Sequence, residues 1–111
     1  MLGRAVRTLR HPPLEEVALG QVLYALSDPV RLGVVRQLAR HGEATCSALD
    51  GGRPKSSMSH HFRVLREAGL VRTRTDGPAH MNELRRAELD ARFPGLLAAV
   101  LAAEPEAAET A

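Results

Sequence analysis

Apolar positions follow a helical period over most of the chain and an alternating period over one stretch after residue 70. Three segments place apolar residues three and four positions apart, which predicts amphipathic helices over 14–26, 29–41 and 55–68. Asp28 and Pro29 suit the N-cap and first turn of the second helix, and a glycine follows its last residue. A short element over 45–50 and a Gly-Gly-Arg-Pro turn separate the last two helices.

The alternating stretch predicts a β-hairpin. Val71–Thr75 alternates apolar or small residues with arginine, an Asp-Gly-Pro turn follows, and His80–Leu84 can return as the second strand. The chain then has an Ala- and Leu-rich helical pattern over 87–103. Pro94 interrupts this pattern and should kink the helix or begin a new one.

Three helices followed by a two-stranded hairpin form the element order of a winged helix-turn-helix. We therefore predict an α+β fold, mostly helical, in which the hairpin is the wing. A length of 111 residues suits a single domain. We divide the chain into a basic, disordered or loosely docked arm over 1–13, the domain proper over 14–103, and a flexible acidic tail over 104–111.

Composition excludes several classes of protein. One cysteine cannot form an internal disulfide, which excludes a disulfide-stapled secreted domain. The sequence has no signal-peptide run and no stretch approaching about 18 apolar residues, so we expect a soluble cytoplasmic protein. One Tyr and two Phe are too few for base stacking on an aromatic platform.

The formal net charge of +2 conceals an uneven distribution. Residues 1–13 carry a net charge of +3, 14–50 carry −2, and 87–111 carry −4. Residues 51–86 hold eight basic and three acidic groups, a net charge of +5, and cover the third helix and the hairpin. A basic block of this kind is typical of a nucleic-acid-binding surface.

The exposed face of the third helix has chemistry suited to the major groove of B-DNA. An α-helix fits that groove, short hydroxyls and cations reach phosphates or base edges, and the first helical turn presents free N–H groups to phosphate. The alternative for these side chains is helix capping and solvation, and for the hairpin arginines a solubilising edge charge. The candidate DNA-binding residues are Lys55, Ser56, Ser57, Ser59, His60 and Arg63 on the helix and Arg72, Arg74 and His80 on the hairpin.

The run Ser59–Leu70 (SHHFRVLREAGL) resembles the ArsR family of bacterial winged-helix regulators. Leu26–Leu32 is similar to the family's second-helix start, Arg72–Leu84 to its wing, and Leu89–Leu97 to a terminal helix of some members. The resemblance implies a homodimer formed through the first and last helices, operator binding, and repression released by an effector. The sequence leaves open a small-molecule effector, a redox effector and no effector at all. It also implies that four of the recognition-helix residues face DNA: Ser56, Ser57, Ser59 and His60.

Many members of that family sense soft metals through paired cysteines on the short helix that corresponds to the element over 45–50. Here Thr45 and Ser47 occupy the outer positions and the lone Cys46 lies between them. One thiolate cannot make such a site, because soft ions want two to four sulfur or imidazole ligands, so we expect neither metal nor cofactor. Cys46 is either a small packing residue or a redox-responsive thiol. His61 lies nearer the apolar face of its helix, where we expect a structural hydrogen bond.

The sequence therefore predicts a dimeric, sequence-specific repressor that binds double-stranded DNA. The alternative is a winged-helix protein–protein module that does not bind an operator and whose basic face meets an acidic partner. An enzyme is not expected, because Cys46 has no orienting third group beside a nearby histidine and the Gly-Gly pair is only a turn.

Overall fold

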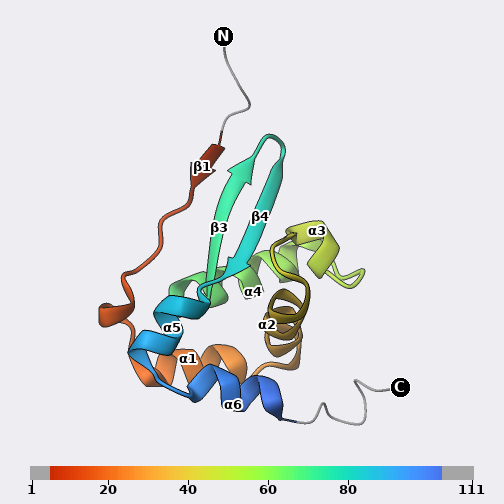
Figure 1. The fold of residues 1–111 in the computed structure, drawn as a ribbon. Helices are drawn as coiled ribbons and strands as arrows, with labels where there is room; N and C mark the ends of the chain where they lie inside the picture. The colour runs from red at the N-terminus through yellow and green to blue at the C-terminus, as the bar shows by residue number, and fades with distance from the viewer. Residues whose placement is uncertain (1–5, 104–111) are drawn as a thin grey trace.

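The computed structural model describes residues 6–103, with side chains from Leu9 onward; residues 1–5 of the predicted arm and the predicted tail over 104–111 lie outside this range. Figure 1 shows a body of helices from which a long β-hairpin projects. The elements in chain order are β1 (Val6–Thr8), the 3-10 helix η1 (Leu14–Glu16), α1 (Leu19–Leu26), α2 (Pro29–His41), β2 (Ala44–Thr45), α3 (Cys46–Leu49), α4 (Lys55–Glu67), β3 (Val71–Asp76), β4 (Ala79–Leu84), α5 (Arg86–Arg92) and α6 (Leu96–Ala102).

The helix α2 begins and ends at the residues predicted from the sequence, and the C-terminal helical segment is interrupted where predicted. The side chain of Asp28 accepts hydrogen bonds from the backbone N–H groups of Val30 and Arg31, and Pro29 begins α2. Gly42 follows α2 with a φ of 83°, a conformation that costs glycine little. The helical pattern near the C-terminus is divided at Pro94, so α5 and α6 are separate helices as predicted.

The apolar segment 14–26 is not one helix, contrary to the sequence prediction. Leu14–Glu16 forms a single 3-10 turn, Val17 and Ala18 are extended, and α1 begins only at Leu19. Leu14 and Val17 are nonetheless buried, so the apolar pattern marks core residues correctly but misses the change in backbone conformation. Tertiary packing, which the periodicity does not report, favours the extended connection.

The wing is part of a four-stranded antiparallel sheet in the order β1-β3-β4-β2. Strands β3 and β4 form the predicted hairpin, with Val71 opposite Leu84 and Asp76 opposite Ala79. The short strand β2 covers one edge of the hairpin and β1 covers the other. Covering both edges satisfies backbone groups that an isolated hairpin would leave exposed.

One hydrophobic core joins the helices to the base of the wing. It includes Val22 and Ala25 from α1, Val35 from α2, and Leu65 and Leu70 from α4 and the turn after it, all with no measurable exposure. The core thereby fixes α4 and the hairpin relative to each other. The structure confirms an α+β winged helix-turn-helix fold.

Candidate nucleic-acid interface

Helix α4 buries one face and exposes the other. Met58, Phe62 and Leu65 lie in the core, at 3%, 3% and 0% exposure. The opposite face is open to solvent and carries the cationic and hydroxyl side chains selected from the sequence. All six are exposed: Lys55, Ser56, Ser57, Ser59, His60 and Arg63.

The first turn of α4 is open to a ligand. Pro54 is the N-cap residue and supplies no side-chain acceptor, while its carbonyl accepts from the Ser57 hydroxyl at 3.0 Å. The first backbone N–H groups of a helix have no intrahelical partner, and the helix dipole adds positive potential there. Lys55 adds a full charge at the same end, so this turn suits a phosphate.

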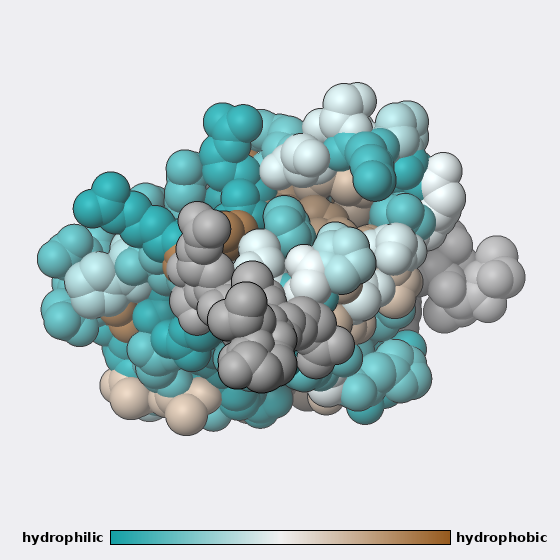
Figure 2. Space-filling model, turned by 90° about the horizontal axis from the view of Figure 1, so that it is seen from above, coloured by the Kyte–Doolittle hydropathy of each residue, from teal (hydrophilic) through white to brown (hydrophobic). Residues whose placement is uncertain are grey.

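A hollow of about 330 Å³ lies between α3, the first half of α4 and the tip of the wing. It brings together Lys55 and Ser59 from α4 and His80 from β4. Met58 and Phe62 contribute apolar walls. Figure 2 looks onto the end of the molecule with the wing tip and shows a largely hydrophilic surface with hydrophobic residues in recessed areas. The structure therefore brings two of the recognition-helix candidates, Lys55 and Ser59, beside His80. The hollow does not include Ser56, Ser57, His60 or Arg63.

The half-buried Cys46 begins α3 and also lines this hollow. Its Sγ accepts a hydrogen bond from Asn82 Nδ2 at 3.2 Å. Asn82 is fully buried, and its Oδ1 accepts from the Thr73 hydroxyl at 2.7 Å. This polar chain connects α3 to both strands of the wing. The two roles considered for Cys46, as a packing residue and as a redox-responsive thiol, both remain predictions.

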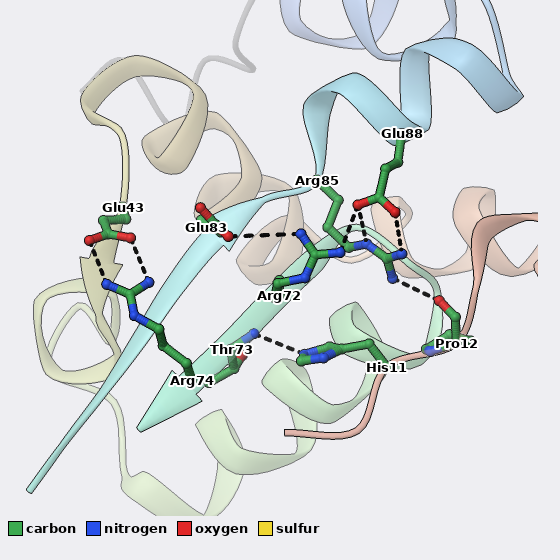
Figure 3. Close-up of polar contacts among 9 residues, drawn as sticks. All are labelled: His11, Pro12, Glu43, Arg72, Thr73, Arg74, Glu83, Arg85 and Glu88. Carbon is green, nitrogen blue, oxygen red and sulfur yellow. Dashed lines mark hydrogen bonds and ion pairs between the residues drawn. The ribbon is translucent and has the colours of Figure 1, made fainter. Parts of the chain in front are cut away.

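The two wing arginines are held by carboxylates, as Figure 3 shows. Arg74 makes a bidentate pair with Glu43 at 2.8 and 2.9 Å, and its hydrogen bond lowers the pKa of that carboxyl. Arg72 contacts Glu88 at 2.8 Å and Glu83 at 3.9 Å. The structure does not bring either arginine into the hollow with Lys55 and His80.

Glu88 is shared by two arginines. Arg85, with a side chain only 3% exposed, reaches Glu88 Oε2 at 2.9 Å, and Arg72 reaches Oε1. The hydrogen bond from Arg85 is the largest cause that lowers the pKa of Glu88, to about 2. No role for Arg85 could be predicted from the sequence, because the spacing of charges does not show which guanidinium becomes buried.

Arg31 is a second buried cation that the sequence did not single out. Its Nε donates to the Ala25 carbonyl at 2.8 Å and its Nη2 to that of Tyr24 at 3.2 Å. Its Nη1 lies 3.2 Å from His61 Nδ1, which ties α4 to the junction of α1 and α2. Burial is the largest cause that lowers the pKa of His61. His61 thus has the structural hydrogen-bonding position expected for it.

The segment before η1 is attached to the wing. Residues Val6–Pro12, here named the N-terminal strap, include β1, and the backbone N–H of Leu9 donates to the Thr73 carbonyl at 3.0 Å. His11 Nε2 accepts from the Thr73 N–H at 2.9 Å, and the Pro12 carbonyl accepts from Arg85 Nη1 at 2.8 Å. From Val6 onward the predicted loosely docked arm is therefore attached to the wing, first by the pairing of β1 with β3 and then by the contacts of His11 and Pro12 with Thr73 and Arg85, which Figure 3 shows.

Within residues 6–103, no three His, Cys, Asp or Glu side chains are grouped so that they could hold a metal ion. No helix in the same range is long and apolar enough to cross a membrane.

Comparison with known proteins places this architecture in a family. The family described as "Helix-turn-helix domain" matches residues 26–74. An uncharacterized HTH-type transcriptional regulator of Bacillus subtilis, YceK, is 36% identical over 80 residues, covering 69% of this chain and 80% of its own. The arsenical resistance operon repressor of Staphylococcus xylosus is 34% identical over 73 residues, covering 65% and 70%.

A solved structure agrees with these sequence relatives. An ArsR family transcriptional regulator superposes with a TM-score of 0.62 at 28% sequence identity, over 73% of this chain and 90% of the other. The family match over residues 26–74 includes α2, α3 and α4 and the first four residues of β3. The chain belongs to the ArsR family of winged helix-turn-helix transcriptional regulators.

Proposed function

We propose that this regulator represses transcription by binding an operator in double-stranded DNA with α4 in the major groove. The exposed face of α4 carries this proposal. This face carries Lys55, three serine hydroxyls, His60 and Arg63, and the opposite face of the helix is buried in the core. Such a face can place hydrogen bonds on base edges while the cations contact phosphate.

The wing supports the same orientation. His80 shares the hollow at the end of α4 with Lys55 and Ser59, so a duplex on α4 would also pass the wing tip. Arg72 and Arg74 are partly exposed and paired with carboxylates. To contact DNA, each guanidinium must either bind a phosphate and its carboxylate at the same time or leave the carboxylate for the phosphate. We therefore assign base recognition to α4 and backbone positioning to the wing.

We propose a homodimer formed through α1 and α6. Three large apolar side chains on α1 are exposed: Leu19 at 45%, Leu23 at 47% and Tyr24 at 59%. Val100 and Leu101 on α6 are only partly buried. A second copy of the same surface would cover these groups and present two recognition helices to an operator with half-sites about one helical turn apart.

The repressor role is drawn from the relatives together with this geometry. The Staphylococcus xylosus relative is named an operon repressor. A dimer seated across two half-sites would obstruct a promoter that overlaps them, without any further domain. An effector would act by shifting the balance between the DNA-bound and free conformations.

The test begins with an operator selected from fragments of genomic DNA, whose affinity is then measured by fluorescence anisotropy over a range of salt concentrations. The double variant Lys55→Ala/His60→Ala should lose at least tenfold in affinity, whereas Arg86→Ala, an exposed residue on α5, should not. Undiminished binding by the double variant, or a salt-independent affinity, would contradict the proposal. Sedimentation should show a dimer that Leu23→Glu dissociates.

A further inference from the structure

We propose that Arg31 positions the recognition helix α4 by bonding to neutral His61, and that protonation of His61 breaks this bond and weakens binding to the operator. The inference rests on the proposed function and adds a regulation of the same surface by pH. Neither residue is among the proposed DNA contacts, so both act through the orientation of α4.

The guanidinium of Arg31 is a buried junction of three helices. Arg31 belongs to α2 and is 4% exposed. Its Nε and Nη2 donate to the carbonyls of Ala25 and Tyr24 in the last turn of α1, at 2.8 and 3.2 Å. Its Nη1 lies 3.2 Å from Nδ1 of His61, in the middle of α4. Because a planar guanidinium presents its donors in fixed directions, these bonds set the position of α4 relative to α1 and α2.

The same guanidinium reaches the surface proposed for dimerisation. It lies over the ring of Tyr24, 5.1 Å from the ring centroid, and Tyr24 is 59% exposed. A second copy that covers this ring would remove water from the contact, and desolvation strengthens a cation–π interaction. Arg31 therefore joins the proposed dimer surface on α1 to the proposed DNA-binding helix.

The bond between Arg31 and His61 requires a neutral imidazole. Nδ1 can accept from the guanidinium only while it carries no proton, and the imidazolium form has donors alone. Protonation would also place a second positive charge 3.2 Å from Arg31 Nη1, in a partly buried contact that salt screens less than an exposed one. Protonation of His61 therefore replaces an attraction between α2 and α4 with a repulsion.

The surroundings of His61 keep it neutral at pH 7. Burial is the largest cause that lowers its pKa, and the carboxylate of Asp28, the N-cap of α2, raises it. Three basic groups on α2, on α4 and in the segment before α4 lower it further: Arg31, His60 and Arg53. The net pKa lies below the ordinary value of 6.5. The neutral form and its bond are therefore complete above pH 6.5 and are lost as the pH falls through the lowered value.

Loss of the bond changes the fraction of molecules whose recognition helix has the DNA-binding orientation. His60 precedes His61 on α4, and the centroids of the two rings are 5.7 Å apart. A shift of α4 at His61 therefore displaces a proposed DNA contact. Because the apparent affinity falls in proportion to the binding-competent fraction, the dimer binds its operator tightly at neutral pH and less tightly in acid.

The pH dependence of operator affinity, measured by fluorescence anisotropy for wild type and His61→Asn, tests the inference. The side-chain oxygen of asparagine can accept a hydrogen bond near the place of Nδ1, and it does not titrate. His60 and His80 are common to both proteins, so their titration cancels in the ratio of the two affinities. This ratio should be constant above pH 6.5. Below it, wild type should weaken several-fold relative to His61→Asn before the onset of acid unfolding.

A variant of Arg31 tests the other side of the bond. Arg31→Lys retains the charge but loses the planar set of donors, so it should weaken operator binding several-fold at pH 7.5. Arg40→Lys, at an exposed position of the same helix, is the matched control and should bind as wild type does. An equal loss in Arg40→Lys would overturn the assignment to Arg31. If circular dichroism shows that Arg31→Lys is unfolded, the comparison with His61→Asn decides alone.

The outcomes separate this inference from the proposed function. If the affinity ratio of wild type to His61→Asn stays constant from pH 8 to the onset of acid unfolding while Lys55→Ala/His60→Ala weakens binding, the inference is overturned and the proposed function stands. A wild type that gains affinity relative to His61→Asn in acid also overturns the inference, since protonated His61 would then favour binding. Undiminished binding by Lys55→Ala/His60→Ala would overturn the proposed function and this inference together.

Discussion

His11 Nε2 accepts a hydrogen bond from the backbone N–H of Thr73 at 2.9 Å, across 62 residues of sequence. An imidazole nitrogen can accept this bond only while it is unprotonated. Burial is the largest cause that lowers the pKa of His11, and the charges of Arg72, Arg85 and Arg66 lower it further, while a hydrogen bond with the Leu9 backbone opposes them. The attachment of the strap to the wing is therefore coupled to the protonation of one side chain.

The first prediction is that the strap loosens in acid. The pKa of His11 in the folded protein lies below its ordinary value of 6.5, so the stabilisation is fully present above pH 6.5 and is lost as the pH falls through the lowered value. Hydrogen exchange of the Thr73 amide, corrected for the intrinsic rate, should show protection at pH 7.5 that decreases toward pH 5. The His11→Ala variant should show low protection at both values. Full protection of this amide in wild-type protein at every pH down to the onset of acid unfolding would contradict the prediction.

The second prediction concerns the carboxylate that two arginines share. Glu88→Gln should reduce the free energy of unfolding at pH 7 by about 1–2 kcal/mol, since it weakens the charged hydrogen bonds of Arg85 and Arg72, and partial exposure of Glu88 limits the effect. Because the pKa of Glu88 is lowered from 4.5 to about 2, its contribution is complete above pH 4.5 and is lost as the pH falls toward 2.

Urea unfolding at pH 7 and pH 2.5 measures this difference. The gap between wild type and Glu88→Gln should narrow at the lower pH. Asp90→Asn, which breaks the exposed pair with Arg86, is the matched control and should change stability by less than about 0.5 kcal/mol. If the free energies of unfolding of wild type and Glu88→Gln differ by the same amount at both pH values, the charge of Glu88 is not the source of its contribution to stability.

The third prediction is that the polar chain inside the wing stabilises the fold. Asn82→Ala removes the partner of the Thr73 hydroxyl, which is fully buried, and the donor to the Sγ of the half-buried Cys46. The loss in free energy of unfolding should be about 1–3 kcal/mol, as expected when buried polar groups lose their partners. His80→Ala, two residues earlier and exposed, should cost less than about 0.5 kcal/mol. Equal stability of the two variants in urea would refute the assignment.

The fourth prediction separates two glycines by their surroundings. Gly69 ends α4 with a φ of 76°, and a Cβ added there would lie 3.1 Å from Leu14 Cδ1. Gly69→Ala should destabilise the protein by about 1–3 kcal/mol, because of the backbone strain and the close approach. Gly33 lies inside α2 with nothing within 4 Å of an added Cβ, so Gly33→Ala should stabilise it by about 0.5–1 kcal/mol. Thermal unfolding that ranks the two variants in the opposite order would contradict the prediction.

The elements that depend on neighbouring residues were predictable from the sequence. The N-cap at Asp28, the new helix after Pro94 and the apolar face of α4 all follow from residues within a few positions of each other. The hairpin is equally local, because its alternation and its turn lie within fourteen residues, Val71–Leu84. The same local patterns identified the exposed helix face that now carries the proposed DNA contact.

Only the tertiary structure decided the partners of the charged groups and of the strap. Arg74 forms its ion pair with Glu43, 31 residues away in the sequence, and His11 accepts a hydrogen bond from Thr73, 62 residues away. No periodicity encodes such pairs, since they depend on how the sheet packs against the helices. Sequence alone determined the winged helix-turn-helix and its basic recognition helix. Folding decided that the hairpin arginines are neutralised by carboxylates and that the first strand completes the wing, because long-range contacts arise only when the packed core sets distant segments side by side.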